Sequence, residues 1–247
     1  MSRLQRLIVA LRRPVKYGVD TALDVQVWGQ RLRLSPRGNI AEAKLLFAPQ
    51  FFDAEERAFL ERLLKPGATF VDVGANVGAY TYWAHHCLLD SGCIVAVEPD
   101  PEMRRRLEFN LRSNDVQSVR VVSAALSDEQ GQGVLYVNQA QRGENTIAAT
   151  QARAAGGARV SEAVKLDTLV HTLQSLGVES VDALKIDIEG HELPVLRHFF
   201  AHAPESLWPR ALLVEHKHEA AAELQRLFTN CGYRRTLETR LNHGYER

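Results

Sequence analysis

The sequence predicts a doubly wound α/β fold, and two stretches carry this prediction. In the first, the apolar run 70–73 breaks into Gly74-Ala75-Asn76-Val77-Gly78 and continues into a helical segment from Tyr80. In the second, the apolar run 93–97 ends in Glu98. Short apolar runs between helical segments are typical of parallel strands that are buried on both faces of a sheet. We therefore expect two neighbouring strands that end at the same edge of a mostly parallel sheet.

The glycine turn between the first strand and its helix predicts a nucleotide site. Glycine lets the backbone approach a ligand closely, and the first N–H groups of the helix point toward it. An acid at the tip of the next strand, here Glu98, can accept both hydroxyl groups of a ribose. Asn76 stands where a dinucleotide pattern requires glycine, and Asp72 precedes the turn. A carboxylate there disfavours a pyrophosphate and suits a sulfonium group, so we predict S-adenosyl-L-methionine bound by Asp72, Gly74, Asn76, Gly78 and Glu98.

Three motifs resemble those of the FkbM-type S-adenosylmethionine-dependent methyltransferases and occur in the same order. They are Val71-Asp72-Val73-Gly74-Ala75-Asn76-Val77-Gly78, Val97-Glu98-Pro99-Asp100-Pro101 and Leu184-Lys185-Ile186-Asp187-Ile188-Glu189-Gly190-His191-Glu192. The resemblance implies a class I, Rossmann-like fold with a seven-stranded sheet and an enzyme that methylates a hydroxyl group of a sugar, glycolipid or natural product. It also implies that Ala125, just past the third strand, lies against the adenine ring.

Composition is ordinary for a soluble globular protein. The chain has 247 residues, of which 45% are hydrophobic, and its 30 basic and 30 acidic side chains cancel. This balance does not favour nucleic acid as a partner. The three cysteines fit neither a disulfide framework nor a zinc site and suit a reducing cytoplasm. The sequence does not specify an oligomeric state.

The segment before the glycine turn, residues 1–65, is expected to form an extension that covers the ligand of the domain at 66–247. Its first eighteen residues are basic and apolar at helical spacing, which indicates either a helix packed on its own domain or one in weak contact with a membrane surface. Alternation from Leu23 to Leu34 around Trp28-Gly29 predicts a hairpin. A short helix over 40–47 follows, and Asp53 is expected to cap a second, amphipathic helix.

The segments after Glu98 continue the alternation of helix and strand. We expect a helix over 101–113, a strand over 119–122 and another over 131–137. The region 138–157 is irregular, and residues 142–146 fall where resembling enzymes carry a substrate-side loop, although a plain surface loop fits equally well. The segment from Val164 to Leu169 then leads into a helix that ends near Gly177.

The candidate catalytic residues follow two strands that we expect to be neighbours. Lys185, Asp187 and Glu189 alternate along a strand predicted over 183–188, and the strand from Ala211 ends in Glu215 and His216. Ligands bind beyond the carboxyl ends of such strands, so Asp187, Glu215 and His216 are candidates for the general base that takes the proton of an alcohol. Any one of the three could be the base, with another orienting it.

Other interpretations of the same residues remain open. Lys185 could serve only to pair with Asp187, and Glu189 only the N-terminus of the following helix. Asp187, Glu189, His191, Glu215 and His216 could also hold a magnesium-like ion, but no ligand spacing supports a metal, and we expect none. A nicotinamide-dependent oxidoreductase and a non-catalytic nucleotide-binding protein are the alternative functions. The tail is expected to form a strand near 234–239 that turns back through 242–244.

Overall fold

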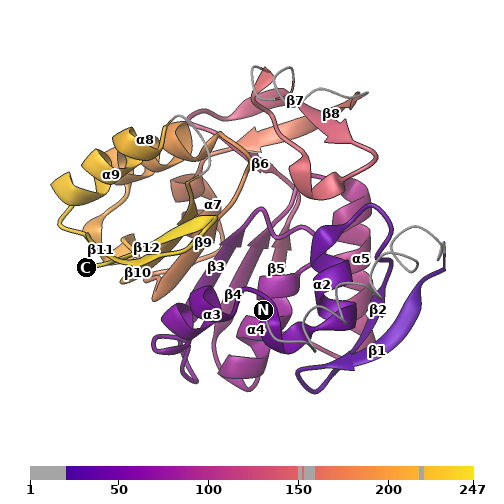
Figure 1. The fold of residues 1–247 in the computed structure, drawn as a ribbon. Helices are drawn as coiled ribbons and strands as arrows, with labels where there is room; N and C mark the ends of the chain where they lie inside the picture. Colours follow the sequence, from indigo (N-terminus) through magenta and orange to yellow (C-terminus); the bar gives the residue numbers. More distant parts are fainter. Residues whose placement is uncertain (1–20, 150–151, 153–158, 217–219) are drawn as a thin grey trace.

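A computed structural model describes residues 21–149, 152, 159–216 and 220–247 (Figure 1). Its centre is a seven-stranded sheet in the order β11-β12-β10-β9-β3-β4-β5. Six of these strands run in the same direction, and β12, between β10 and β11, runs antiparallel to both of its neighbours. The strands are β3 (Thr69–Val73), β4 (Cys93–Val97), β5 (Val119–Val122), β9 (Ala183–Ile186), β10 (Ala211–Glu215), β11 (Arg234–Glu238) and β12 (Asn242–Glu246). The predicted fold class is therefore confirmed.

The order of the strands reverses between β3 and β9. From β3 the chain builds outward through β4 and β5, and it then returns to add β9 and β10 on the other side of β3. In open α/β sheets such a reversal leaves a crevice beyond the carboxyl ends of the strands. The reversal therefore places a ligand site where β3 and β9 end.

Two layers of helices cover the sheet, and each packs on its own apolar cluster. Phe70 of β3 belongs to the cluster shared with α4 (Ala79–Leu88) and α5 (Pro101–Ser113). Val71 and Val73 point to the opposite face and join the cluster of α7 (Leu169–Ser175), α8 (Glu192–His202) and α9 (Ala221–Asn230). A short 3-10 helix, η3 (Glu205–Leu207), precedes β10. The alternation of β3 explains why an apolar run with one acid forms a strand buried on both sides.

The described part of the N-terminal extension lies on the α4 and α5 side of the sheet (Figure 1). It contains β1 (Leu23–Val27), β2 (Gln30–Leu34), α2 (Ile40–Phe47), the 3-10 helix η1 (Pro49–Phe51) and α3 (Ala54–Glu61). The predicted hairpin is confirmed, with Trp28 and Gly29 at φ 49° and 78° in its two-residue turn. The side chains of Asn110 and Asn114 on α5 exchange hydrogen bonds with the backbone of β2 and so attach the hairpin to the domain. The helix predicted over the first eighteen residues lies outside the described residues.

A small second sheet, in the order β6-β8-β7, stands beside the main one (Figure 1). It consists of β6 (Ala125–Leu126), β7 (Gly131–Asn138) and β8 (Arg159–Asp167), with its own apolar cluster around Leu135 and Val137. The 3-10 helix η2 (Arg142–Glu144) follows β7, and Thr146 pairs with Tyr136. Within the described residues no helix has the length and apolar character needed to cross a membrane.

Two local predictions are wrong. Strand β9 ends at Ile186, and Glu189 has φ 53°, so Lys185, Asp187 and Glu189 do not alternate along one strand. Asp53 stands at the N-cap of α3 but makes no side-chain hydrogen bond to it. Its backbone is left-handed, at φ 38° and ψ 56°. Both departures lie at the pocket that the reversal of strand order creates.

Candidate active site

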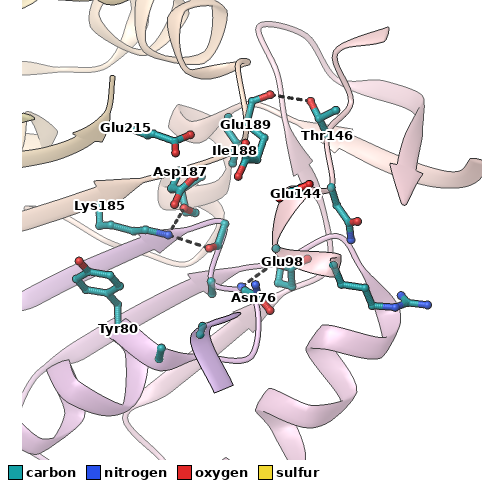
Figure 2. Close-up of a pocket in the computed structure, with 18 of the residues that line it drawn as sticks. Asn76, Tyr80, Glu98, Glu144, Thr146, Lys185, Asp187, Ile188, Glu189 and Glu215 are labelled. Atoms are coloured by element: carbon teal, nitrogen blue, oxygen red, sulfur yellow. Dashed lines mark hydrogen bonds between the residues drawn. The ribbon is translucent and has the colours of Figure 1, made fainter. Parts of the chain in front are cut away.

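One pocket lies at the carboxyl ends of β3, β4, β9 and β10 (Figure 2). The glycine turn and Glu98 line it on one side, and Asp187 and Glu215 line it on another. The segment 141–147 after β7, the helix α2 and the loop before β12 complete its wall. Segments from the extension, the loop after β7 and the tail therefore meet the strand ends at the same opening.

The glycine turn requires its first glycine for packing against β9. Gly74 has φ +72°, and an added Cβ would overlap the carbonyl oxygen of Asp187. The backbone N–H groups of Gly74 and Ala75 both donate to the carbonyl of Val97 at 3.0 Å. The turn is thus fixed from both neighbouring strands, and Gly74 and Asn76 line the pocket.

Gly78 has a different role from the one expected of it. It has φ +90°, and an added Cβ would meet the side chain of Leu107 on α5. Gly78 does not line the pocket. This glycine allows α4 to begin in close contact with α5, so the expected contact of Gly78 with a cofactor is not supported by its position.

Glu98 is buried at the tip of β4 and lines the pocket. Its Oε2 accepts a hydrogen bond of 2.7 Å from the backbone N–H of Asn76, and its Oε1 accepts one of 2.8 Å from Asp100. Burial raises the pKa of Glu98 to about 7, against the lowering effect of these two hydrogen bonds. The carboxylate is therefore held in one orientation beside the turn, as a ribose-binding acid requires.

Asp72 lies beneath the pocket and does not line it. It is fully buried, and its Oδ2 accepts a hydrogen bond of 2.7 Å from the hydroxyl of Thr81 on α4. Its Oδ1 lies 3.5 Å from Nζ of Lys185. The expectation that this carboxylate faces the ligand is wrong, because Asp72 points to the α4 face of β3, where its counter-ion is Lys185.

Lys185 is the buried cation that connects the turn to β9. Its ammonium donates to the carbonyl of Gly74 at 2.9 Å and lies 5.6 Å from the centre of the Tyr80 ring (Figure 2). Burial acts to lower the pKa of Lys185, but the charges of Asp72 and Asp187 outweigh it and raise the pKa above its usual value. Lys185 therefore remains charged, and it lines the pocket.

The pocket residues fit S-adenosylmethionine. Glu98 supplies an acceptor for the ribose, and the turn supplies a backbone that approaches closely. Next to Glu98 the wall is apolar, formed by Ala124, Ala125, Leu126 and Leu135, as an adenine ring requires. Ala125 is thus part of the apolar wall of the pocket.

Asp187 and Glu215 come together at the tips of β9 and β10, as Figure 2 shows. One oxygen of each, together with one of Glu192, lies within 4.8 Å of the others. Glu192 accepts hydrogen bonds from the N–H groups of Ile188 and Gly190. Burial raises the pKa of Glu192, and the charge of Glu215 raises it further. The cluster is a group of acids whose charges influence one another at the edge of the pocket.

The histidines considered in the sequence do not join this cluster. The imidazole of His216 stacks on His243 at 3.9 Å between ring centres, and its Nε2–H donates to the carbonyl of Thr239 at 3.0 Å. His216 does not line the pocket, so the expectation that it reaches the same opening is wrong. These contacts with Thr239 and His243 hold the side chain away from the pocket. His191 precedes α8, with its Nε2 3.2 Å from the hydroxyl of Ser127.

The segment 142–146 lines the pocket, as expected of a substrate-side loop. Arg142 pairs with the buried carboxylate of Asp100 at 2.7 Å, which ties the loop to the start of α5. The hydroxyl of Thr146 donates to the carbonyl of Glu189 at 3.0 Å (Figure 2). The loop is thus held at both ends across the opening.

Several lining residues were not identified from the sequence. They come from the extension, from α4 and from the tail: Lys44, Phe52, Asp53, Tyr80, Leu241 and Asn242. Asp53 gave a misleading signal, because an acid before a helix usually caps it. The tail gave none, since its place beside the pocket depends on the pairing of β12 with β10.

Comparisons with known proteins identify the family and the fold. The family described as "Methyltransferase FkbM domain" matches residues 72–235, which is more than half of the chain. No curated protein is significantly similar to the chain in sequence.

Solved structures with the same fold are distant in sequence. The methyltransferase domain of METTL16 is 12% identical with a TM-score of 0.53, over 96% of this chain and 77% of that one. The FkbM methyltransferase from Methylobacillus flagellatus KT is 13% identical with a TM-score of 0.47, over 99% of this chain and 59% of that one. The precorrin-6y C5,15-methyltransferase from Geobacter metallireducens GS-15 is 14% identical with a TM-score of 0.46, over 78% of this chain and 87% of that one. At 12% identity and a TM-score of 0.53, the likeness to the METTL16 domain concerns the fold alone.

Proposed function

The chain belongs to the FkbM methyltransferase family and is an S-adenosylmethionine-dependent methyltransferase, and from this premise we propose that it methylates a hydroxyl group of a sugar, glycolipid or natural product. When bound, the cofactor supplies an electrophilic methyl group on a sulfonium. Glu98 would hold its ribose, the wall at Ala125 its adenine, and the turn at Gly74 and Asn76 the part between adenosine and sulfonium.

The observation that carries O-methylation is the position of Asp187 beside this turn. An alcohol is a poor nucleophile until its proton is shared, and a base within reach contributes roughly 10²- to 10⁴-fold to the rate. Asp187 lines the pocket and is partly exposed, whereas Glu215 beside it is 2% exposed. An acceptor therefore reaches Asp187 more readily. In our proposal Asp187 takes the proton, and the more deeply buried Glu215 beside it helps to orient Asp187.

Polar side chains from the loop after β7 and from β12 support a polyhydroxylated acceptor. Glu144, Thr146 and Asn242 line the pocket and offer carboxylate, hydroxyl and amide groups. Such groups hydrogen-bond to sugar hydroxyls. Their positions are set by the loop after β7 and by the tail, from which they come. Holding the acceptor oxygen in place supplies a large part of the catalysis for a displacement with no covalent enzyme intermediate.

A transfer assay with matched acceptors tests the proposal. The purified chain would be incubated with S-adenosylmethionine and panels of sugars, glycolipids and polyketide alcohols, and with the corresponding amino compounds. We expect S-adenosylhomocysteine to form with hydroxyl acceptors and mass spectrometry to place the new methyl on oxygen. Methylation of the amino compounds alone would contradict O-methylation while leaving the cofactor assignment intact.

A further inference from the structure

The extension places an ion pair on the wall of the pocket, between Lys44 of α2 and Asp53. Nζ of Lys44 lies 2.7 Å from Oδ1 of Asp53, and their side chains are 32% and 20% exposed. The hydroxyl of Tyr80, at the start of α4, donates to Oδ2 of Asp53 at 3.3 Å. All three residues line the pocket. The pair therefore contacts both the domain and the space in which a ligand lies.

The conformation of Asp53 is unusual for a purely structural residue. It stands at the N-cap of α3 without capping it and adopts a left-handed backbone at φ 38°. A left-handed backbone is uncommon for a residue other than glycine, and such strain concentrates at functional sites. The consequence of the conformation is that the carboxylate turns from the helix toward Lys44 and the pocket.

The order of the strand tips shows which part of a ligand reaches this pair. The apolar wall at Ala125 and the acid Glu98 lie at the β5 and β4 side, and the glycine turn follows at β3. A ligand that places adenosine at Glu98 and crosses the turn arrives at Tyr80, Lys44 and Asp53. Asp187 and Glu215 lie on the β9 and β10 side and belong to the acceptor.

We propose that Lys44 and Asp53 bind the methionine end of S-adenosylmethionine. Lys44 pairs with the α-carboxylate of the cofactor, and Asp53 pairs with its α-ammonium group. An amino acid zwitterion needs one cation and one anion, and this pair presents both side by side. A partly exposed ion pair is worth little by itself, so opening it to admit the zwitterion costs little and forms two ion pairs in its place. The proposal rests on the assigned cofactor and adds two residues of the extension to its site.

The test uses two compounds that differ only in the part in question. S-adenosylhomocysteine carries the amino acid end, whereas 5′-methylthioadenosine carries the adenosine and the sulfur without it. Calorimetric titration of both into the full chain, into Lys44→Met and into Asp53→Asn separates the effects. We expect each substitution to weaken S-adenosylhomocysteine about tenfold or more and to leave methylthioadenosine within about twofold. Retained methylthioadenosine binding also shows that the variant is folded.

Arg62→Met is the matched control. Arg62 also belongs to the extension and forms an ion pair of 2.9 Å with Glu246 of β12. Because Arg62 does not line the pocket, the affinity for both ligands should be unchanged. Equal loss of both ligands in Lys44→Met and Asp53→Asn would overturn the proposal and make the pair a structural support. Unchanged binding with a raised KM for the acceptor would also overturn it. If the unmodified chain binds neither compound, the cofactor assignment itself fails.

Discussion

The backbone N–H of Asn76 donates a hydrogen bond of 2.7 Å to Oε2 of Glu98, so the glycine turn and the tip of the neighbouring strand hold each other in place. Asn76 is in the left-handed region at φ 53°, within the turn that presents its N–H to the carboxylate. The ribose acid is thus part of the turn's own structure. A change at Glu98 should act on cofactor binding and on the turn together.

Replacing Glu98 with glutamine should weaken cofactor binding. The amide keeps the shape but loses the charge that strengthens hydrogen bonds from the ribose, and its NH2 group would face the N–H of Asn76 or of Asp100. We expect the Kd for S-adenosylhomocysteine to rise about 10-fold or more by calorimetry. Glu102→Gln, in the first turn of α5 and outside the pocket, is the control and should bind normally. Equal affinities in the Glu98 and Glu102 variants would refute the ribose assignment.

Cofactor affinity should depend on pH near neutrality. Burial raises the pKa of Glu98 to about 7, and the ribose hydroxyls donate best to the ionised carboxylate. Affinity should therefore fall below pH 7, approaching about tenfold per pH unit, and level off above it. The raised pKa of Glu98 also affects the stability of the protein without a ligand. Its contribution to the free energy of unfolding is fully present below the pKa of Glu98 in the unfolded chain and is lost as the pH rises to about 7. The Glu98→Gln variant should show neither dependence, and a profile unchanged by that substitution would assign the effect to another group.

Gly74→Ala should destabilise the protein more than the strain of its backbone explains. Gly74 and Gly177 both have positive φ, at +72° and +66°, but only at Gly74 would a Cβ overlap a neighbouring backbone atom, the carbonyl of Asp187. We expect Gly177→Ala to lower the free energy of unfolding by about 1–2 kcal/mol. The loss at Gly74 should exceed this by about 2 kcal/mol or more. Equal losses in urea unfolding would show that β3 and β9 separate easily at their tips.

Lys185→Met should leave an uncompensated charge in the interior. Asp72 is fully buried 3.5 Å from the Lys185 ammonium, and removing one partner of a buried pair typically costs about 3–5 kcal/mol. Lys165→Met removes a 2.7 Å pair with Asp167 in which the lysine side chain is 56% exposed, and should cost less than about 1 kcal/mol. Unfolding by urea measures both. A Lys185 variant as stable as the Lys165 variant would mean that Asp72 takes up a proton without cost.

The elements that local pattern determines were predictable. The run from Phe70 through the glycine turn into α4, and Glu98 at the end of β4, depend on apolar periodicity and on glycine, which are visible in the sequence. What could not be predicted depends on contacts between distant segments. Asp53 resembles a helix cap until Lys44 and Tyr80 are placed beside it, and the direction of His216 depends on its contacts with Thr239 and His243.

The direction of a side chain also separates Asp72 from Glu98. Both acids belong to the motifs of the site, but Asp72 lies within β3 and points beneath the sheet, whereas Glu98 follows the last residue of β4 and faces the pocket. Strand alternation could have indicated this for Asp72, since Phe70 on the same face packs in the α4 cluster. The residue at which β3 ends before the turn could not be predicted from the sequence, because it depends on the pairing of β3 with β9.

The most direct test of the account is single-turnover methyl transfer by Asp187→Asn, with the hydroxyl acceptor that the panel identifies. We expect the rate of transfer to fall by roughly 10²-fold or more, while the Kd for S-adenosylhomocysteine stays within about twofold. Glu215→Gln should lower the rate less, and His216→Ala, outside the pocket, should retain it. An Asp187→Asn variant that transfers methyl at the unmodified rate would contradict the account, as would loss of activity on chelation that added magnesium restores.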